Sequence, residues 1–146
     1  MSAQASIEVR TTPDVVFDIL ADPRQHHLID GSGTVTGHVS GPDRLSLGAE
    51  FAMNMKQGAS YKVKNKVVEF EEDRLIAWRH ISPHRWRYEL EPVTIDGAPG
   101  TRVTETWDLS PVPGPIRWFL DRAMGKRTQH ALEETLVKLR DAAERR

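Results

Sequence analysis

The sequence predicts a single α+β domain over residues 1–146, in which a curved antiparallel sheet of seven strands is covered by a long C-terminal helix. Three observations support this fold class. Apolar and polar residues alternate with a period of two from Thr34 to Ser110, two short helical segments precede this region, and apolar residues recur at helical spacing after it. Because one face of such a sheet must be buried, we expect the last helix to lie across its concave face.

Composition excludes several classes of protein. The net charge is −1 and there is no cysteine, so nucleic-acid binding, disulfides and thiolate catalysis are not expected. The N-terminal residues lack the basic flank and apolar core of a signal peptide, and no apolar run reaches the roughly 18 residues of a membrane span. We therefore expect a cytoplasmic protein without stable membrane insertion. Its oligomeric state stays open between a monomer and a weak dimer.

The N-terminal segment is predicted to form one strand followed by two short helices. Residues Ala5–Arg10 alternate weakly between apolar and polar side chains, as in a strand. The first helix begins at Pro13, since proline suits the first helical position, and ends at Asp22 because a residue before proline avoids the α conformation. Asp22 can also cap the second helix, which runs from Pro23 to about Ile29.

Six further strands are predicted between the short helices and the final helix. They cover Thr34–Val39, Leu47–Lys56, Tyr61–Glu71, Leu75–Ile81, His84–Val93 and Arg102–Leu109. The alternation changes phase at Val67–Val68, which indicates a bulge or a strong twist. In the strand Leu75–Ile81, the alternation leaves open which parity faces inward, that of Trp78 and His80 or that of Arg79.

The final helix is predicted to begin near Pro115 and to bend. Its apolar residues form two stripes, one of Ile116, Phe119, Leu120 and Ala123 and one of Ala131, Thr135, Leu139 and Ala142. The two stripes are out of phase by about a quarter turn at roughly 100° per residue. The offset falls at Gly125–Arg127, where we expect a kink or a short break.

Several stretches of the chain look familiar from a known superfamily. They are Asp22-Pro23 with His26-His27, Asp30 to Val35, Val68 to Phe70, Arg74 to Trp78, Trp86 to Leu90 and Gly100 to Trp107. In these stretches and in its order of elements, the chain resembles the START-like (SRPBCC) superfamily of helix-grip proteins, which includes the polyketide cyclase/dehydrase and lipid-transport proteins. The resemblance implies a hydrophobic ligand cavity under the last helix, and it implies no particular catalytic residue.

The candidate ligand-binding residues are mainly the large side chains on the predicted inner face, because rings and thioethers suit apolar ligands. They are Phe51, Met53, Met55, Tyr61, Asn65, Trp78, Trp86, Tyr88, Glu105, Trp107, Phe119 and Met124. Glu105 lies between Val103 and Trp107 and should point inward, either as a pocket carboxylate or as the structural partner of a neighbouring side chain. Asn65 could orient a ligand carbonyl or bond to nearby backbone.

Acid–base chemistry and metal binding can be assessed from the histidines and carboxylates. If a reaction is catalysed, Glu105 and His80 are the candidate acid and base groups. His27 and Asp30 are expected at the pocket rim. Adjacent His26 and His27 diverge by about 100° on a helix, and no third ligand accompanies His27 and Asp30, so no metal site is predicted. No motif for a cofactor is recognised either.

Three functions are compatible with these features. The first is binding or transport of a small hydrophobic ligand, such as a lipid, a polyketide or an aromatic metabolite, in a cavity between the sheet and the last helix. The second is a polyketide cyclase, aromatase or dehydratase that uses Glu105 and His80. The third resembles the co-chaperone members of the superfamily: a protein-interaction module that uses the C-terminal helix or the lysine strip Lys62, Lys64 and Lys66.

Overall fold

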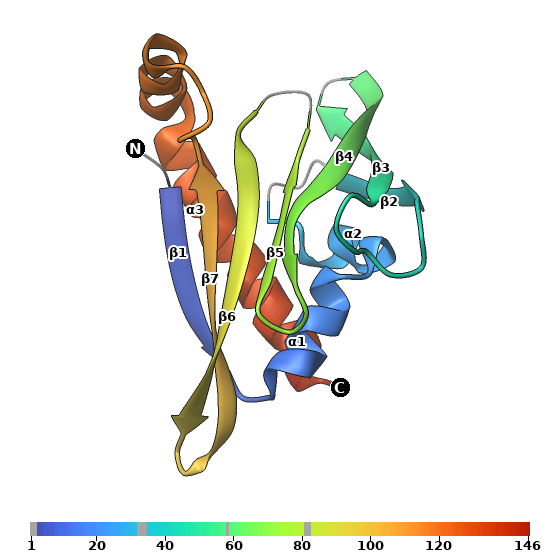
Figure 1. Ribbon diagram of the computed structural model, residues 1–146, viewed down its shortest axis with the longest axis vertical. Coiled ribbons are helices and arrows are strands. Elements are labelled where there is room, and N and C mark those ends of the chain that lie inside the picture. The colour runs from blue at the N-terminus through green and yellow to red at the C-terminus, as the bar shows by residue number, and fades with distance from the viewer. Residues whose placement is uncertain (1–2, 32–34, 58, 81–82) are drawn as a thin grey trace.

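The strands follow one another as an antiparallel meander (Figure 1). The computed structural model describes residues 3–31, 35–57, 59–80 and 83–146, so Thr34, Gly58 and Ile81, which the sequence assigned to strand ends and a turn, lie outside the described residues. Within those ranges the sheet has seven strands in the order β1-β7-β6-β5-β4-β3-β2. The strands are β1 (Ala3–Val9), β2 (Val35–Ser40), β3 (Glu50–Gln57), β4 (Ala59–Glu71), β5 (Leu75–Arg79), β6 (Arg85–Ile95) and β7 (Ala98–Asp108).

Two short helices lie between β1 and β2, as the sequence predicts. They are α1 (Pro13–Leu20) and α2 (His26–Ile29), and the second is preceded by the 3-10 turn η1 (Pro23–Gln25). The Asp22 carboxylate accepts a hydrogen bond from the backbone N–H of Arg24 at 3.0 Å, so Asp22 caps this turn. This cap confirms the predicted role of Asp22 at the start of the second helical segment.

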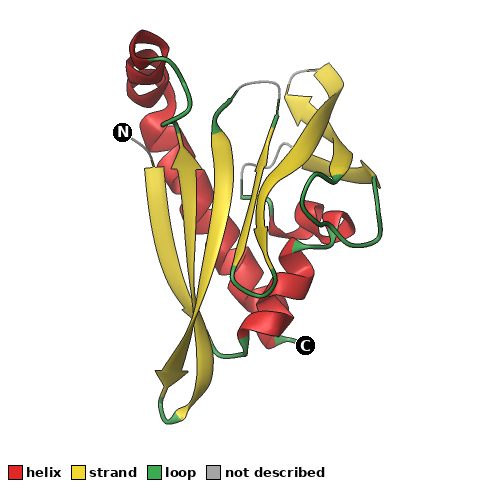
Figure 2. Ribbon diagram, viewed as in Figure 1, coloured by secondary structure: helices red, strands yellow, loops and turns green. Residues whose placement is uncertain are grey.

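The sheet is strongly twisted, and a bulge in β4 contributes to the twist. β1 pairs with β7, so the N-terminal strand lies beside the last strand of the meander. A register shift between Val67 and Glu69 of β4 confirms the predicted bulge, and a bulge increases local twist. Figures 1 and 2 show the resulting curved sheet, with the long C-terminal helix passing behind β7 and β6.

The core lies between the sheet and this helix, α3 (Gly114–Glu144). Leu136 and Leu139 of α3 are buried in one cluster with inward side chains of the strands. Gly31 makes a close approach to α3: a Cβ atom at this position would lie 2.5 Å from a backbone carbonyl oxygen of the helix, and the Gly31 N–H donates to Thr135 Oγ1 at 2.9 Å. These contacts confirm an α+β fold in which a long C-terminal helix covers a curved antiparallel sheet.

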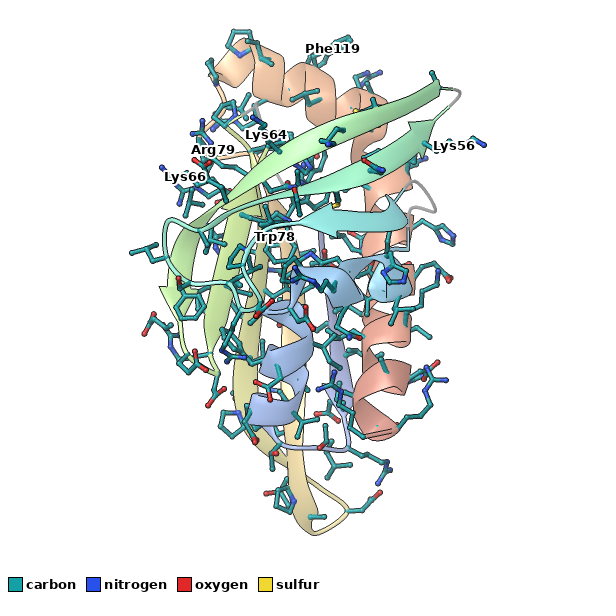
Figure 3. All side chains as sticks on the ribbon, turned by 90° about the vertical axis from the view of Figure 1, so that its right-hand side faces the viewer. Lys56, Lys64, Lys66, Trp78, Arg79 and Phe119 are labelled. Carbon is teal, nitrogen blue, oxygen red and sulfur yellow. The ribbon has the colours of Figure 1, made fainter. Side chains whose placement is uncertain are left out.

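The helix α3 bends but has no break between Gly114 and Glu144. Figure 3 shows that its first turns, which carry Phe119, run across one end of the molecule, while the rest descends along the sheet. The expected bend is therefore present and the alternative of a break is wrong. Most of the first apolar stripe stays in solvent, since Ile116 is 54% exposed and Phe119 is 62% exposed, and only its Leu120 packs against a core cluster. Residues 114–127 are called the α3 arm below.

Candidate ligand-binding pocket

A cavity of about 250 Å³ lies between α2, α3 and the inner face of the sheet. This volume is close to the lower end for ligand pockets, which is roughly 300 Å³. The wall consists of His26, Ile29, Asp30, Met53, Met55, Tyr61, Trp78, His80, Trp86, Tyr88, Glu105, Met124, Arg127, Thr128, Ala131, Leu132 and Thr135. Tyr61 and Met124 are 43% and 42% exposed, so they mark the side on which the pocket meets solvent.

Strand alternation directs the sheet residues into this pocket. On β3, Met53 and Met55 lie two residues apart and both reach the wall. On β5, Trp78 is buried and Arg79 is exposed. The sequence left open which set of alternating residues faces inward, and the structure shows that it is the set containing Trp78. His80 has the same parity and continues this face into the pocket wall.

Trp78 is the centre of an aromatic wall. The ring of His26 stacks on it with 4.7 Å between centroids, and the ring of Tyr88 lies 5.4 Å away. Phe51 packs edge-on against Trp78 at 5.6 Å. Ring pairs at such separations, roughly 4.5–7 Å, attract each other beyond the area that they bury. The wall is therefore well packed around Trp78.

Glu105 is a buried acidic group in the wall. It is 3% exposed and lies opposite Tyr88 in the register of β6 and β7. The Tyr88 hydroxyl donates a hydrogen bond to the carboxyl group, whose Oε1 has no hydrogen-bond partner among the described residues. Burial raises the pKa of Glu105 to about 8; the Tyr88 hydrogen bond opposes this rise and the charge of Asp30 adds to it. At neutral pH the carboxyl group is therefore mostly protonated and neutral.

His26 enters the wall as a neutral imidazole. Its Nε2–H donates to the carbonyl oxygen of Leu20 at 2.9 Å, and because a carbonyl can only accept, the proton resides on Nε2. Nδ1 is then an acceptor, and it has no partner within the part of the chain that the structure describes. Burial lowers the pKa of His26 to about 4, against the raising effects of the Leu20 bond and of Asp22.

A second aromatic group follows β5 at the same side of the sheet. His84 lies 5.8 Å from both Trp86 and Trp107, and these two indoles stack at 6.0 Å. His80 lies 6.3 Å from Trp86. Burial, assisted by the nearby His84, lowers the pKa of His80 to about 4, so His80 is a neutral and weakly basic group at pH 7.

Most of the ligand-binding residues predicted from the sequence line the pocket. They are Met53, Met55, Tyr61, Trp78, Trp86, Tyr88, Glu105 and Met124, together with the candidate base His80 and the rim residue Asp30. Three others are buried but lie outside the wall. Phe51 packs edge-on against His26 and Trp78, Asn65 pairs with Phe51 across β3 and β4, and Trp107 is stacked against Trp86.

Two residues predicted for the site are not part of the pocket wall. Phe119 was expected in the pocket, but it is exposed on the α3 arm because the arm bends away from the sheet. His27, which was expected at the rim, is exposed and does not line the wall. His26 takes the inward position instead, since adjacent helical residues point about 100° apart.

The sequence analysis missed most of the helical side of the pocket, apart from Met124 and Asp30. The missed residues are His26, Ile29, Arg127, Thr128, Ala131, Leu132 and Thr135. Ala131 and Thr135 belonged to a recognised stripe, but periodicity does not distinguish a residue that fills a core from one that lines a cavity. A usable signal was the small size of Thr128, Ala131 and Thr135 at helical spacing, which leaves room on one face of α3.

The described ranges contain neither a metal-binding cluster nor a membrane-spanning helix. There, no group of three or more His, Asp or Glu side chains is arranged so that it could hold a metal ion. Over the same residues, no helix combines the length and the apolar character that crossing a bilayer requires.

The fold and the pocket define a class of protein: a helix-grip domain with an apolar cavity between its C-terminal helix and its sheet. Residues 1–144 match the family described as polyketide cyclase/dehydrase and lipid transport, and the chain belongs to this family. It is 35% identical over 140 residues to the uncharacterized protein Rv0088 of Mycobacterium tuberculosis (strain ATCC 25618 / H37Rv). This alignment covers 93% of the chain and 61% of the relative, so the chain spans about three-fifths of the curated relative's length.

Solved structures share the fold at low sequence identity. The solution structure of the Aha1 dimer from Colwellia psychrerythraea superimposes with a TM-score of 0.66 and 14% identity, covering 99% of this chain and 96% of that one. The crystal structure of protein NE0264 from Nitrosomonas europaea gives 0.68 and 18%, with coverages of 99% and 95%. At these identities the likeness concerns the fold alone.

Proposed function

We propose that the protein binds or carries a small, mainly apolar molecule in the pocket between α3 and the sheet. The observation that carries this proposal is a cavity of about 250 Å³ whose wall is rich in rings and thioethers, such as Trp78, Met53 and Met55. Membership of the polyketide cyclase/dehydrase and lipid transport family supports the same class of ligand. A solid interior would instead have favoured a protein-interaction module.

Buried polar atoms support a ligand with one neutral polar end. Glu105 Oε1, His26 Nδ1 and Trp86 Nε1 are buried without a hydrogen-bond partner in the described chain. An unpaired buried group costs roughly 1–3 kcal/mol, so a ligand hydroxyl or carbonyl that bonds to one of them would gain affinity. Because Glu105 is mostly neutral at pH 7, its O–H can donate to a ligand carbonyl.

Fluorescence titration with the apolar probe N-phenyl-1-naphthylamine tests the proposal. The wild-type protein should give a saturable rise in probe emission. Ala131→Trp places an indole inside the pocket and should abolish this rise, whereas Ala123→Trp, at an exposed position of the same helix, should preserve it. Circular dichroism melts confirm that both variants fold. A wild-type protein without saturable binding, or an Ala131→Trp variant that binds as well as wild type, would overturn the proposal.

One observation favours acid–base catalysis as a second function. Glu105 has a pKa of about 8, close to the pH at which a general acid transfers protons efficiently, and it lines the pocket beside Tyr88. In this function Glu105 protonates a ligand carbonyl oxygen. Turnover of a polyketide-like substrate that is lost in Glu105→Gln while probe binding persists would support catalysis. Turnover that survives in both Glu105→Gln and His80→Ala would contradict it.

A further inference from the structure

The α3 arm, residues 114–127, exposes several large apolar side chains. They are Ile116 at 54%, Trp118 at 64%, Phe119 at 62% and Met124 at 42% exposure. Several large apolar side chains exposed within one short helical segment are typical of a surface that contacts something else. Figure 3 shows Phe119 on the outer edge of the arm, at one end of the molecule.

Cationic side chains accompany this apolar surface. They are Arg117, Arg122, Lys126 and Arg127, and the arm contains one carboxylate, Asp121. The guanidinium of Arg122 lies over the Trp118 ring at 5.5 Å from its centroid. Lys56 lies at the same end of the molecule (Figure 3). The arm is thus strongly cationic although the whole chain carries a net charge of −1.

We propose that the α3 arm docks peripherally on an anionic lipid surface. Indole and phenyl rings are favoured at the level of lipid headgroups, and arginine and lysine are attracted to anionic lipids. The arm combines both features in one exposed helical segment. A second copy of the chain fits this surface less well, because two arms meeting about a two-fold axis would bring their cationic groups together.

The arm also connects the proposed lipid-facing surface with the pocket. Met124 and Arg127 of the arm, and the adjacent Thr128, are part of the pocket wall. Docking therefore brings the solvent-facing side of the pocket next to the lipid, where apolar molecules are concentrated. The docking itself requires neither a spanning helix nor an occupied pocket.

Co-sedimentation with vesicles tests the apolar part of the proposal. Wild-type protein should bind vesicles of phosphatidylcholine mixed with phosphatidylglycerol and bind pure phosphatidylcholine much more weakly. The double variant Trp118→Ser/Phe119→Ser should partition at least about tenfold less, because it loses both interfacial rings. Val137→Ser is the matched control, since it removes an apolar side chain of α3 that is 38% exposed outside the arm, and it should bind like wild type.

A charge pair of variants tests the electrostatic part. Arg117→Gln with Arg122→Gln should weaken binding to the anionic vesicles by about fivefold for each charge removed, and added salt should weaken wild-type binding in the same direction. The matched control is Arg145→Gln with Arg146→Gln, which removes equal charge near the C-terminus, at the opposite end of the molecule from the arm (Figure 1). This control should leave vesicle binding nearly unchanged.

Three outcomes would overturn the docking proposal. The first is equal binding of wild type to both vesicle types. The second is vesicle binding that remains intact in Trp118→Ser/Phe119→Ser. The third is a wild-type protein that does not bind vesicles but forms a dimer in sedimentation velocity, where the dimer is lost in this variant. The last result would identify a second copy of the chain as the occupant of the arm. Titration of the arm variants with N-phenyl-1-naphthylamine should match wild type, so a failure of docking is distinguishable from a failure of the proposed pocket function.

Discussion

Tyr88 on β6 and Glu105 on β7 lie directly opposite each other in the strand register and share a hydrogen bond in the pocket wall. Both side chains are buried, at 4% and 3% exposure. Burial disfavours the charged form of a carboxyl group, so Glu105 holds its proton to a higher pH than usual. The register of two neighbouring strands thus places a neutral acid beside an apolar cavity.

Glu105→Gln should remove part of the pH dependence of stability. The pKa of Glu105 is about 8 in the folded protein, against 4.5 for an ordinary glutamate. The folded state binds this proton more tightly, so its stabilising contribution is fully present below about pH 4.5 and is lost as the pH rises through about 8. In urea unfolding between about pH 5 and pH 9, the free energy of unfolding should fall more steeply for wild type than for Glu105→Gln.

Glu91→Gln supplies the control for this experiment. Glu91 lies on β6, as Tyr88 does, but its side chain is exposed. Its replacement should therefore leave the decrease of unfolding free energy with pH as in wild type. Equal slopes for wild type and Glu105→Gln would show that Glu105 ionises normally.

The replacement His26→Phe should reduce sensitivity to acid. Burial lowers the pKa of His26 from 6.5 to about 4, so the unfolded state binds the proton more tightly. The contribution of the neutral His26 ring to the free energy of unfolding is fully present above about pH 6.5 and is lost as the pH falls through about 4. The variant should be less stable than wild type at pH 7, because the hydrogen bond to Leu20 is lost. It should, however, lose less stability than wild type on acidification. Because His80 also has a lowered pKa, both proteins should keep some dependence of stability on pH. His27→Gln, at the exposed neighbour, is the control and should unfold in acid at the same pH as wild type. Identical acid unfolding of His26→Phe and wild type would contradict the lowered pKa of His26.

Gly31→Ala should loosen the contact between α3 and the segment after α2. A Cβ atom at residue 31 would lie 2.5 Å from the Ala131 carbonyl oxygen and 2.6 Å from the Thr135 backbone nitrogen, so the backbone has to shift. We expect a loss of roughly 1–3 kcal/mol in the free energy of unfolding. Gly114→Ala is the control, because the nearest atom to its Cβ would be 3.8 Å away on a flexible arginine. Matching denaturation midpoints for the two variants would speak against a tight contact at Gly31.

Arg87→Gln should destabilise the outer face of the sheet. Arg87 bonds Glu69 and Asp108, each at 2.8 Å, and all three side chains are largely shielded from solvent. Its removal should cost roughly 1–3 kcal/mol at neutral pH. The Arg87 hydrogen bond lowers the pKa of Glu69. The difference in unfolding free energy between wild type and Arg87→Gln should therefore shrink as the pH falls and this carboxylate is protonated. The exposed pair of Arg102 with Glu8 gives the control: Arg102→Gln should cost less than about 1 kcal/mol. Equal losses of unfolding free energy for Arg87→Gln and Arg102→Gln in urea would contradict the larger contribution expected of Arg87.

Much of the sheet was predictable because strands obey a strict period of two. Alternation placed Met53 and Met55 on the inner face, and the change of phase at Val67 located the bulge. The Asp22-Pro23 pair located the boundary between the two short helices for a local reason, since a residue before proline leaves the α conformation and an aspartate there can cap the next turn.

Features that depend on distant partners were not predictable in the same way. Both parities of β5 contain apolar residues, so only the packed sheet decides that Trp78 faces inward. Helical periodicity shows that Ile116 and Phe119 share a face but not whether anything lies opposite that face. The bend of α3 decides this, and it leaves both side chains in solvent.

NMR of methionine methyl groups during titration with N-phenyl-1-naphthylamine tests the central claim most directly. Met53 and Met55 line the pocket from β3, whereas Met124 lines its solvent-facing side and is 42% exposed. A probe bound beneath α3 should shift the Met53 and Met55 methyl signals with the same saturation curve as the fluorescence. Shifts confined to Met124, or no methyl shift at saturating probe, would mean that the apolar molecule does not enter the cavity beneath α3.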